Sequence, residues 1–348
     1  MIALLLGTLI CLILFALPTI IVDPLFHYHG PIDGIQYGFG NERYQNDGII
    51  RHYAYDALIT GSSMTENFKT SEVDGLWAAR SIKIPFEAAG LKETGGAISR
   101  AIGHNDKLEH IFWGVDLWTL DAGKDWLAYD ISRYPTYLYD ENPFNDVKYF
   151  LNKEVLVNST WESAILYTIK GGSTTSFDSY ANWMHNRIFG REAVLAMHTH
   201  RPEAAQQRAF DSDAQRIVRE NLEQNVIPLA AQNPNIDFYF FFTPVSILWW
   251  DNARGDGMLD FYIEMMRYTA KLLLPYENIR LYSFFDEYDI VCDLDNYKDS
   301  AHYHEDINSQ MLLWMHRDEH RLTEDNYEAY FEEIMDFYTS YDYEEFAA

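Results

Sequence analysis

The chain is poor in cysteine, with only Cys11 and Cys292 among its 348 residues. Cys11 lies in an apolar run near the N-terminus, whereas Cys292 lies in an acidic segment near the C-terminus. We therefore expect no disulfide between them, and cysteine usage does not identify the compartment in which the protein folds.

Basic residues are also scarce: 26 Lys and Arg stand against 53 Asp and Glu, for a formal net charge of −27. This charge repels phosphate backbones and leaves no basic stripe to neutralise them, so we expect no nucleic-acid partner. Hydrophobic residues make up 48% of the chain and aromatic residues 16%, which is enough for a sizeable core and excludes general disorder.

Charged residues are absent from Ile2 to Val22. A helix of this length spans about 30 Å, the thickness of a bilayer core, so we predict a transmembrane anchor at residues 1–22. A cleaved signal peptide is the alternative, but Leu17-Pro18-Thr19 supplies no small-x-small cleavage site. No Lys or Arg flanks the run to set its orientation. Because most of the chain follows it, we expect the body to be extracytoplasmic.

Residues 23–54 are expected to form a juxtamembrane collar, rich in aromatic residues, with a loop at 34–48. His27 and His29 lie within this collar and would be close enough in sequence to form a metal pair. A polar and aromatic collar against the membrane-proximal face explains them without a metal.

Strand and helix patterns alternate through the remaining domain, residues 55–348. Strands are predicted at 55–60, 82–87, 109–115, 236–243 and 279–285, and helices at 71–80, 91–102, 212–232, 259–274, 307–315 and 324–338. This alternation predicts an α/β fold with a five-stranded parallel sheet. Residues 117–208 break the alternation, and we interpret them as an insertion that forms a lid or an acceptor platform.

Two short motifs point to serine chemistry. The apolar run of the first strand ends in Gly61-Ser62-Ser63, a turn that can leave the Ser63 hydroxyl above the sheet edge, with Ser62 as the next candidate. Far downstream, Asp299 precedes His302 by three residues. His302 can act as the base that a serine nucleophile needs, and Asp299 can orient the ring. Alternatively, Asp299 caps the last helix and His302 bonds locally.

In this order and spacing, the two motifs resemble those of the SGNH (GDSL-like) hydrolases and acyltransferases. The Gly-Ser-Ser turn resembles that of the membrane-anchored member that transfers D-alanine in lipoteichoic acid synthesis. The resemblance implies a flavodoxin-like three-layer fold and a catalytic triad of Ser63, His302 and Asp299. In this family the first motif has aspartate where this chain has Ser62.

The resemblance also implies an oxyanion hole, which donates hydrogen bonds to the developing negative charge. Its members would be the amides of Ser63 and Gly90. The family's third donor is an asparagine side chain, where this chain has Asp116, which cannot donate when ionised. Asn67 is a possible substitute donor. Gly90 can also be read as a turn residue and Asp116 as a structural one.

Metal chemistry is the rival interpretation. His198-Thr199-His200 and His302-Tyr303-His304 each contain His-x-His, which ligates zinc only when a third ligand joins. We expect no metal and no cofactor. Carboxylate-pair glycosidase chemistry is formally possible, but acidic residues are too abundant for any pair to be informative.

The sequence thus favours a membrane-anchored, extracytoplasmic serine esterase or O-acyltransferase. By resemblance, its substrate would be an acyl ester of a cell-envelope glycan or glycolipid, and an integral-membrane acyltransferase could supply the acyl group. The sequence does not separate hydrolysis from transfer. The alternative is a non-catalytic surface protein that keeps the fold and binds glycans through the aromatic insertion.

Overall fold

A six-stranded sheet forms the centre of the computed structural model, which describes residues 1–185, 187–202 and 204–346. The strand order is β2-β1-β3-β4-β5-β6. The strands are β1 (Ala57–Thr60), β2 (Ser81–Lys83), β3 (His110–Val115), β4 (Asp237–Phe242), β5 (Ile279–Ser283) and β6 (Arg321–Leu322). The first five are mutually parallel, whereas β6 is antiparallel to β5. The predicted α/β class is therefore confirmed, but the sheet has one strand more than the five predicted, because two residues are too few to give a sequence pattern.

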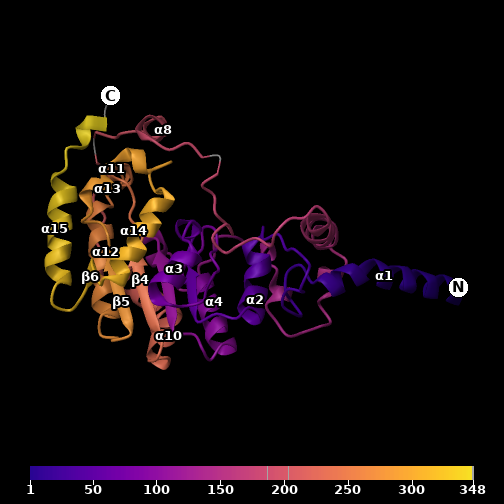
Figure 1. The fold of residues 1–348 in the computed structure, drawn as a ribbon. Coiled ribbons are helices and arrows are strands. Elements are labelled where there is room, and N and C mark those ends of the chain that lie inside the picture. The colour runs from indigo at the N-terminus through magenta and orange to yellow at the C-terminus, as the bar shows by residue number, and fades with distance from the viewer. Residues whose placement is uncertain (186, 203, 347–348) are drawn as a thin grey trace.

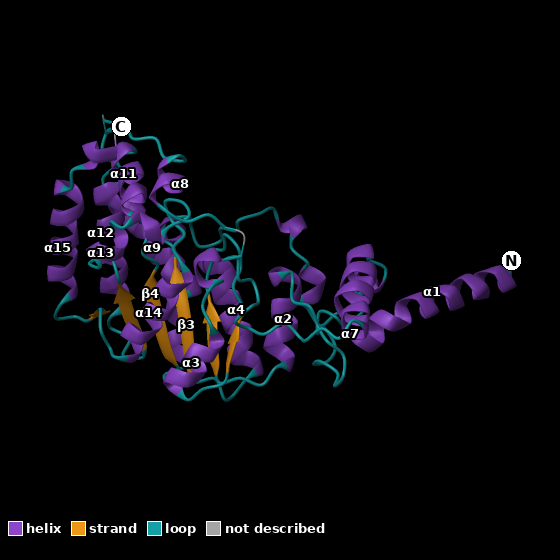
Figure 2. Cartoon of the chain, turned by 45° about the horizontal axis from the view of Figure 1, so that its top comes forward, coloured by secondary structure: helices purple, strands orange, loops and turns teal. Residues whose placement is uncertain are grey.

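Helices cover both faces of this sheet (Figures 1 and 2). On β3, Phe112 packs 4.7 Å from the ring of Trp77 in α3, whereas its neighbour Trp113 donates a 3.1 Å hydrogen bond to Thr94 in α4. Successive residues of a strand point to opposite faces, so α3 and α4 lie on opposite sides. Helix α14 packs on α3, and α9, α12 and α15 continue the row begun by α4. The result is a three-layer domain.

The helices of the sheet domain are α3 (Thr70–Trp77), α4 (Leu91–His104), α9 (Ser212–Asn225), α10 (Ile227–Gln232), α11 (Ile247–Gly255), α12 (Leu259–Leu273), α13 (Tyr288–Val291), α14 (Glu305–His316) and α15 (Tyr327–Ser340). In the insertion, the described residues form the short α-helices α5 (Leu117–Leu120), α6 (Val147–Phe150), α7 (Tyr167–Ile169) and α8 (Arg191–Leu195). They also form two 3₁₀ helices, η2 (Ile131–Arg133) and η3 (Thr136–Leu138), and a π-helix, η4 (Glu154–Leu166). The single helix predicted at 212–232 is divided at Val226 into α9 and α10.

The predicted loop at 34–48 is wrong in its second half, where α2 (Glu42–His52) begins. Asn41 caps this helix by accepting a hydrogen bond from the Tyr44 amide. Its buried side chains include the polar residues Gln45, Asn46 and Asp47, so the segment has no apolar helical periodicity. A helix buried through polar contacts is invisible to hydrophobic patterning.

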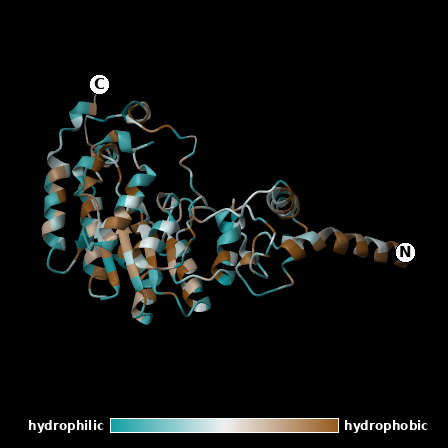
Figure 3. Cartoon of the chain, in the orientation of Figure 1, coloured by the Kyte–Doolittle hydropathy of each residue, from teal (hydrophilic) through white to brown (hydrophobic). Residues whose placement is uncertain are grey.

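Helix α1 (Ile2–Val22) projects from the body and is hydrophobic along its length (Figure 3). It is long and apolar enough to cross a membrane. Asp23 ends it in the left-handed conformation, and the Asp23 carboxylate accepts hydrogen bonds from the amides of His27, Tyr28 and His29 at 2.7–3.1 Å. The collar is therefore organised around one buried carboxylate.

The two collar histidines do not face a common site. His27 Nε2 lies 3.4 Å from Asp146, whereas His29 Nδ1 lies 2.7 Å from the Gly30 carbonyl oxygen. The insertion also reaches this region, because the hydroxyls of Thr19 in α1 and Thr160 in η4 are 3.0 Å apart. The end of the apolar helix, the collar and the insertion thus form one packed region.

Gly48 in α2 tests this packing. A Cβ at this position would overlap the carbonyl oxygens of Leu25 and Phe26, whereas a Cβ at Gly75 in α3 would meet no atom within 4 Å. We expect Gly48→Ala to lower the free energy of unfolding by about 1–3 kcal/mol. The matched control Gly75→Ala should raise it by about 0.5–1 kcal/mol, because alanine is the better helix former. Denaturant unfolding of the full chain in detergent would measure both, and equal stability of the two variants would contradict the observed collar packing.

Candidate active site

The predicted site residues lie at the carboxyl edge of the sheet, where the chain reverses its direction of strand addition. From β1 the chain passes outward to β2 and then back to β3, so β1 and β3 are neighbours. Ser63 follows β1 and Asp116 follows β3. Crevices at such switch points are the usual ligand sites of open α/β sheets.

The turn after β1 depends on glycine. Gly61 has φ of +151°, and a Cβ there would lie 2.7 Å from the Gly114 carbonyl oxygen on β3. The Ser62 hydroxyl then accepts a 3.2 Å hydrogen bond from the Met64 amide, and the short 3₁₀ helix η1 (Ser63–Thr65) begins. This arrangement turns the two serine side chains toward different partners.

Ser63, His302 and Asp299 form a continuous chain of hydrogen bonds. Ser63 Oγ lies 2.9 Å from His302 Nε2, and His302 Nδ1 lies 2.9 and 3.0 Å from the two Asp299 oxygens. Ser63 and His302 are 239 residues apart in sequence. Asp299 does not cap the following helix, because His304 is the N-cap of α14. The alternative in which Asp299 caps the helix is therefore wrong, whereas His302 bonds both to the neighbouring Asp299 and to the distant Ser63.

The Asp299 carboxylate is held ionised by its surroundings. Burial raises the pKa of this carboxyl group, but the hydrogen bonds from the His302 ring and from the amides of His302 and Ala301 outweigh burial. The pKa of Asp299 therefore lies well below its ordinary value. The ring of His302 is thus oriented by a carboxylate that stays charged at neutral pH.

Asp116 is fully buried near the other serine, Ser62. Its carboxylate accepts a 3.1 Å hydrogen bond from the Thr243 hydroxyl. Burial raises the pKa of Asp116 to about 6, and the Ser62 and Thr243 side chains oppose the rise. The Ser62 hydroxyl accepts from the Met64 amide, whereas Ser63 Oγ faces His302.

The other candidate oxyanion donors differ in whether they already form a hydrogen bond. Among the hydrogen bonds of the described residues, none is donated by the Ser63 or Gly90 backbone amide. Gly90 is the N-cap of α4 and packs against Trp126. The loop before it is fixed beside the nucleophile turn by a 2.9 Å hydrogen bond from the Phe86 amide to the Gly61 carbonyl oxygen. The side-chain oxygen of Asn67 accepts a 3.1 Å hydrogen bond from the Trp183 amide. Asn67 therefore also serves to hold the insertion.

Trp183 is a site residue that sequence reasoning missed. Its indole Nε1 donates a 3.0 Å hydrogen bond to the Ser63 carbonyl oxygen, and its ring meets the His302 ring edge-on at 5.4 Å. The Lys298 ammonium lies 4.2 Å from the centre of the indole ring. The insertion thus contacts the triad directly. The sequence shows that residues 117–208 are rich in aromatic residues, but it does not indicate which of them reaches the site.

A buried polar network beneath the nucleophile was also missed. Lys83 is completely buried on β2 and donates to the carbonyl oxygens of Glu66 and Phe68. Burial lowers the pKa of Lys83 to about 7. Burial and the neighbouring Glu42 carboxylate raise the pKa of Glu66, so the Glu42–Glu66 pair holds a proton at neutral pH.

Glu42 also borders a cavity of about 550 Å³ between the N-terminal part of α2 and the insertion. Its walls combine charged and aromatic side chains, including those of Arg43, Arg133, Tyr129 and Tyr180. Asn182, the residue before Trp183, lines it as well. The insertion therefore contributes both to this polar, aromatic cavity and, through Trp183, to the contacts of Ser63.

The His-x-His motif of His198 and His200 takes no part in the Ser63–His302–Asp299 chain. Both side chains point at Asp251 on α11, at 2.7 and 2.9 Å. In the His302-Tyr303-His304 motif, by contrast, His302 belongs to the triad and His304 caps α14.

No protein-family model matches this chain, and no curated protein or solved structure is significantly similar to it.

The raised pKa of Asp116 makes a testable contribution to stability. A carboxyl group with a higher pKa in the folded than in the unfolded chain favours folding while protonated and costs stability once it ionises. Relative to Asp116→Asn, the wild type should lose stability as pH rises from about 4 to 6, by about 3 kcal/mol in total for a shift of this size. Urea unfolding between these pH values would measure the difference. The exposed Asp106→Asn change controls for the loss of a surface charge, and a pH-independent difference for Asp116→Asn would contradict the buried carboxyl.

Proposed function

We propose that this protein is a membrane-anchored serine esterase or O-acyltransferase of the SGNH type, with its catalytic domain outside the cytoplasm. The observation that carries the proposal is the chain of hydrogen bonds from Ser63 through His302 to Asp299. A chain of this order activates a serine, because the ring accepts the hydroxyl proton at Nε2 while the carboxylate holds Nδ1–H.

The reaction follows from these positions. Ser63 Oγ attacks the carbonyl carbon of an acyl ester as its proton passes to His302 Nε2, and the amides of Ser63 and Gly90 stabilise the oxyanion. His302 then protonates the leaving alcohol, which departs and leaves an acyl-serine. Water or a sugar hydroxyl, deprotonated by His302, attacks the acyl-serine and regenerates Ser63. Hydrolysis and transfer share every step except the identity of this second nucleophile.

Two features of the fold support the SGNH resemblance. The five parallel strands follow the order 2-1-3-4-5, which is the order of flavodoxin-like sheets. Ser62 stands where the family has aspartate and Asp116 where it has asparagine, and Ser62 is close enough to Asp116 to lower the pKa of its carboxyl group. A buried carboxyl group thus lies near the nucleophile turn although the turn itself lacks aspartate.

The surroundings of the site support a glycan or glycolipid ester as substrate. Sugars are bound by polar groups and aromatic faces, and the 550 Å³ cavity between α2 and the insertion offers both. Helix α1 would hold this cavity near a membrane surface, where cell-envelope polymers and an acyl-supplying membrane protein are within reach. A non-catalytic glycan-binding protein would use the same cavity, but it would not need the Ser63–His302–Asp299 alignment.

Covalent labelling tests the nucleophile. We expect a fluorophosphonate probe to label the full chain in detergent and Ser63→Ala to abolish labelling, because only the Ser63 hydroxyl faces His302. Ser62→Ala is the matched neighbour and should still be labelled. Labelling that survives in Ser63→Ala but disappears in Ser62→Ala would reverse the assignment, and absence of labelling in the wild type would favour the binding protein.

Kinetic coupling tests the triad as a unit. Asp299→Asn should lower the rate of ester hydrolysis by roughly 10⁴-fold, because the ring loses the group that fixes its tautomer. Adding Asp299→Asn to Ser63→Ala should cost little more than Ser63→Ala alone. The rates of the two single variants and the double variant on an activated acetyl ester decide this. Losses that multiply would place Asp299 and Ser63 in different sites.

A further inference from the structure

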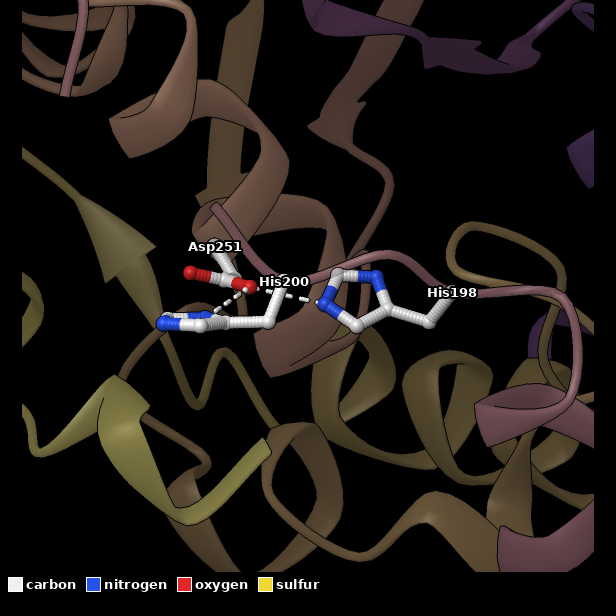
Figure 4. A group of neighbouring side chains, drawn as sticks. All are labelled: His198, His200 and Asp251. Carbon is white, nitrogen blue, oxygen red and sulfur yellow. Dashed lines mark hydrogen bonds and ion pairs between the residues drawn. The ribbon is translucent and has the colours of Figure 1, made fainter. Parts of the chain in front are cut away.

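His198, His200 and Asp251 form a second cluster of chemically reactive side chains, outside the triad (Figure 4). The two histidines lie on the strap, defined here as residues 196–202, which follows α8 at the end of the insertion. Asp251 lies on α11 of the sheet domain. The side chains of His198, His200 and Asp251 are only 4%, 4% and 1% exposed. Three potential metal ligands thus meet in a buried position.

We propose that these three side chains bind one zinc ion or a similar divalent transition metal. His198 Nε2 and His200 Nδ1 lie 2.7 and 2.9 Å from the same atom, Asp251 Oδ2. Two imidazole nitrogens and one carboxylate oxygen are a donor set that zinc takes, with a water in the fourth position. Ligand atoms around tetrahedral zinc are about 3.3 Å apart, since each lies about 2.0–2.1 Å from the ion. Each ring nitrogen needs to move only about half an ångström further from Asp251 Oδ2 to make room for the ion.

The surroundings of the cluster match those of a metal site. Arg254 donates a 3.0 Å hydrogen bond to Asp251 Oδ1, which orients the carboxylate and leaves Oδ2 directed at the histidines. The outer nitrogen of His200, Nε2, lies 3.6 Å from Glu344 Oε1 in the C-terminal segment. A metal-bound histidine commonly directs its other N–H toward a carboxylate, and this pair is placed for such a contact although 3.6 Å is longer than a hydrogen bond.

An arrangement without a metal, in which two neutral histidines donate hydrogen bonds to the Asp251 carboxylate, explains the cluster less well. If both rings donate to Asp251, His200 Nε2 presents a lone pair toward the Glu344 carboxylate, which is repulsive. The buried atoms His198 Nδ1 and His200 Nε2 have no hydrogen-bond partner among the described residues. A metal at His200 Nδ1 leaves a proton on Nε2 that faces Glu344 favourably. A protonated His200 is the other arrangement that achieves this.

The ion would fasten the end of the insertion to the sheet domain. The strap already contacts α11 through Arg201, whose guanidinium donates to the Asn252 carbonyl oxygen and pairs with Asp256 at 2.6 Å. Trp183, which covers the triad, belongs to the same insertion. The ion would thus link two parts of the chain, and its binding does not depend on the proposed esterase function.

Metal titration tests the proposal. The full chain, purified in detergent without a histidine tag and stripped with EDTA, should bind one Co²⁺ with the visible absorption of a four-coordinate ion, and Zn²⁺ should displace it. His198→Gln and His200→Asn should weaken Co²⁺ binding at least tenfold, because each removes a ligand nitrogen. His316→Gln changes an exposed histidine on α14 and should bind as the wild type does.

Either of two results would overturn the proposal: a wild type that takes up no stoichiometric Co²⁺, or ligand variants that bind as tightly as the wild type. Where the variants fail to fold, the thermal midpoint of the wild type decides. It should rise with Zn²⁺ relative to EDTA and not with Mg²⁺. A midpoint that is insensitive to Zn²⁺ would mean that hydrogen bonds alone hold the cluster together, and the proposal would fail.

Discussion

The hydrogen bonds to Asp299 are the interactions on which the geometry of the site depends. Two backbone amides and the His302 ring share this carboxylate, so the loop before α14 is folded around the group that orients the base. This loop then brings His302 to Ser63 at the opposite end of the domain sequence. Without a carboxylate at this point, neither the loop conformation nor the ring orientation would be defined.

Buried ionisable groups recur around the nucleophile, and each is stabilised by a different partner. Asp116 is held by the Thr243 hydroxyl, Lys83 by two carbonyl oxygens, and Glu66 by a second carboxyl group. Burial shifts the pKa of each toward its neutral form. Such a concentration of perturbed groups at a sheet edge is typical of functional sites, because a surface used only for packing is better served by apolar residues.

The end of the apolar helix and the Ser63 site are physically connected through the insertion. Thr160 of η4 contacts the end of α1, Trp183 contacts Ser63, and His198 and His200 reach α11. One segment therefore touches the apolar helix, the triad and α11 of the sheet domain. The position of the triad relative to α1 depends on how this segment is held.

The sequence by itself determined the α/β class, the positions of five strands within two residues at their starts, the apolar helix, and the Ser63, His302 and Asp299 motifs. These features come from local patterns, namely hydrophobic periodicity, glycine turns and short spacings.

Tertiary structure alone decided the rest. Helix α2 is buried by polar contacts, β6 is too short to have a pattern, and Trp183 is one aromatic residue among many until the fold brings it to Ser63. Asp251 likewise joins two histidines about fifty residues earlier in the chain. Contacts between distant segments depend on how elements pack, and no local pattern encodes that packing.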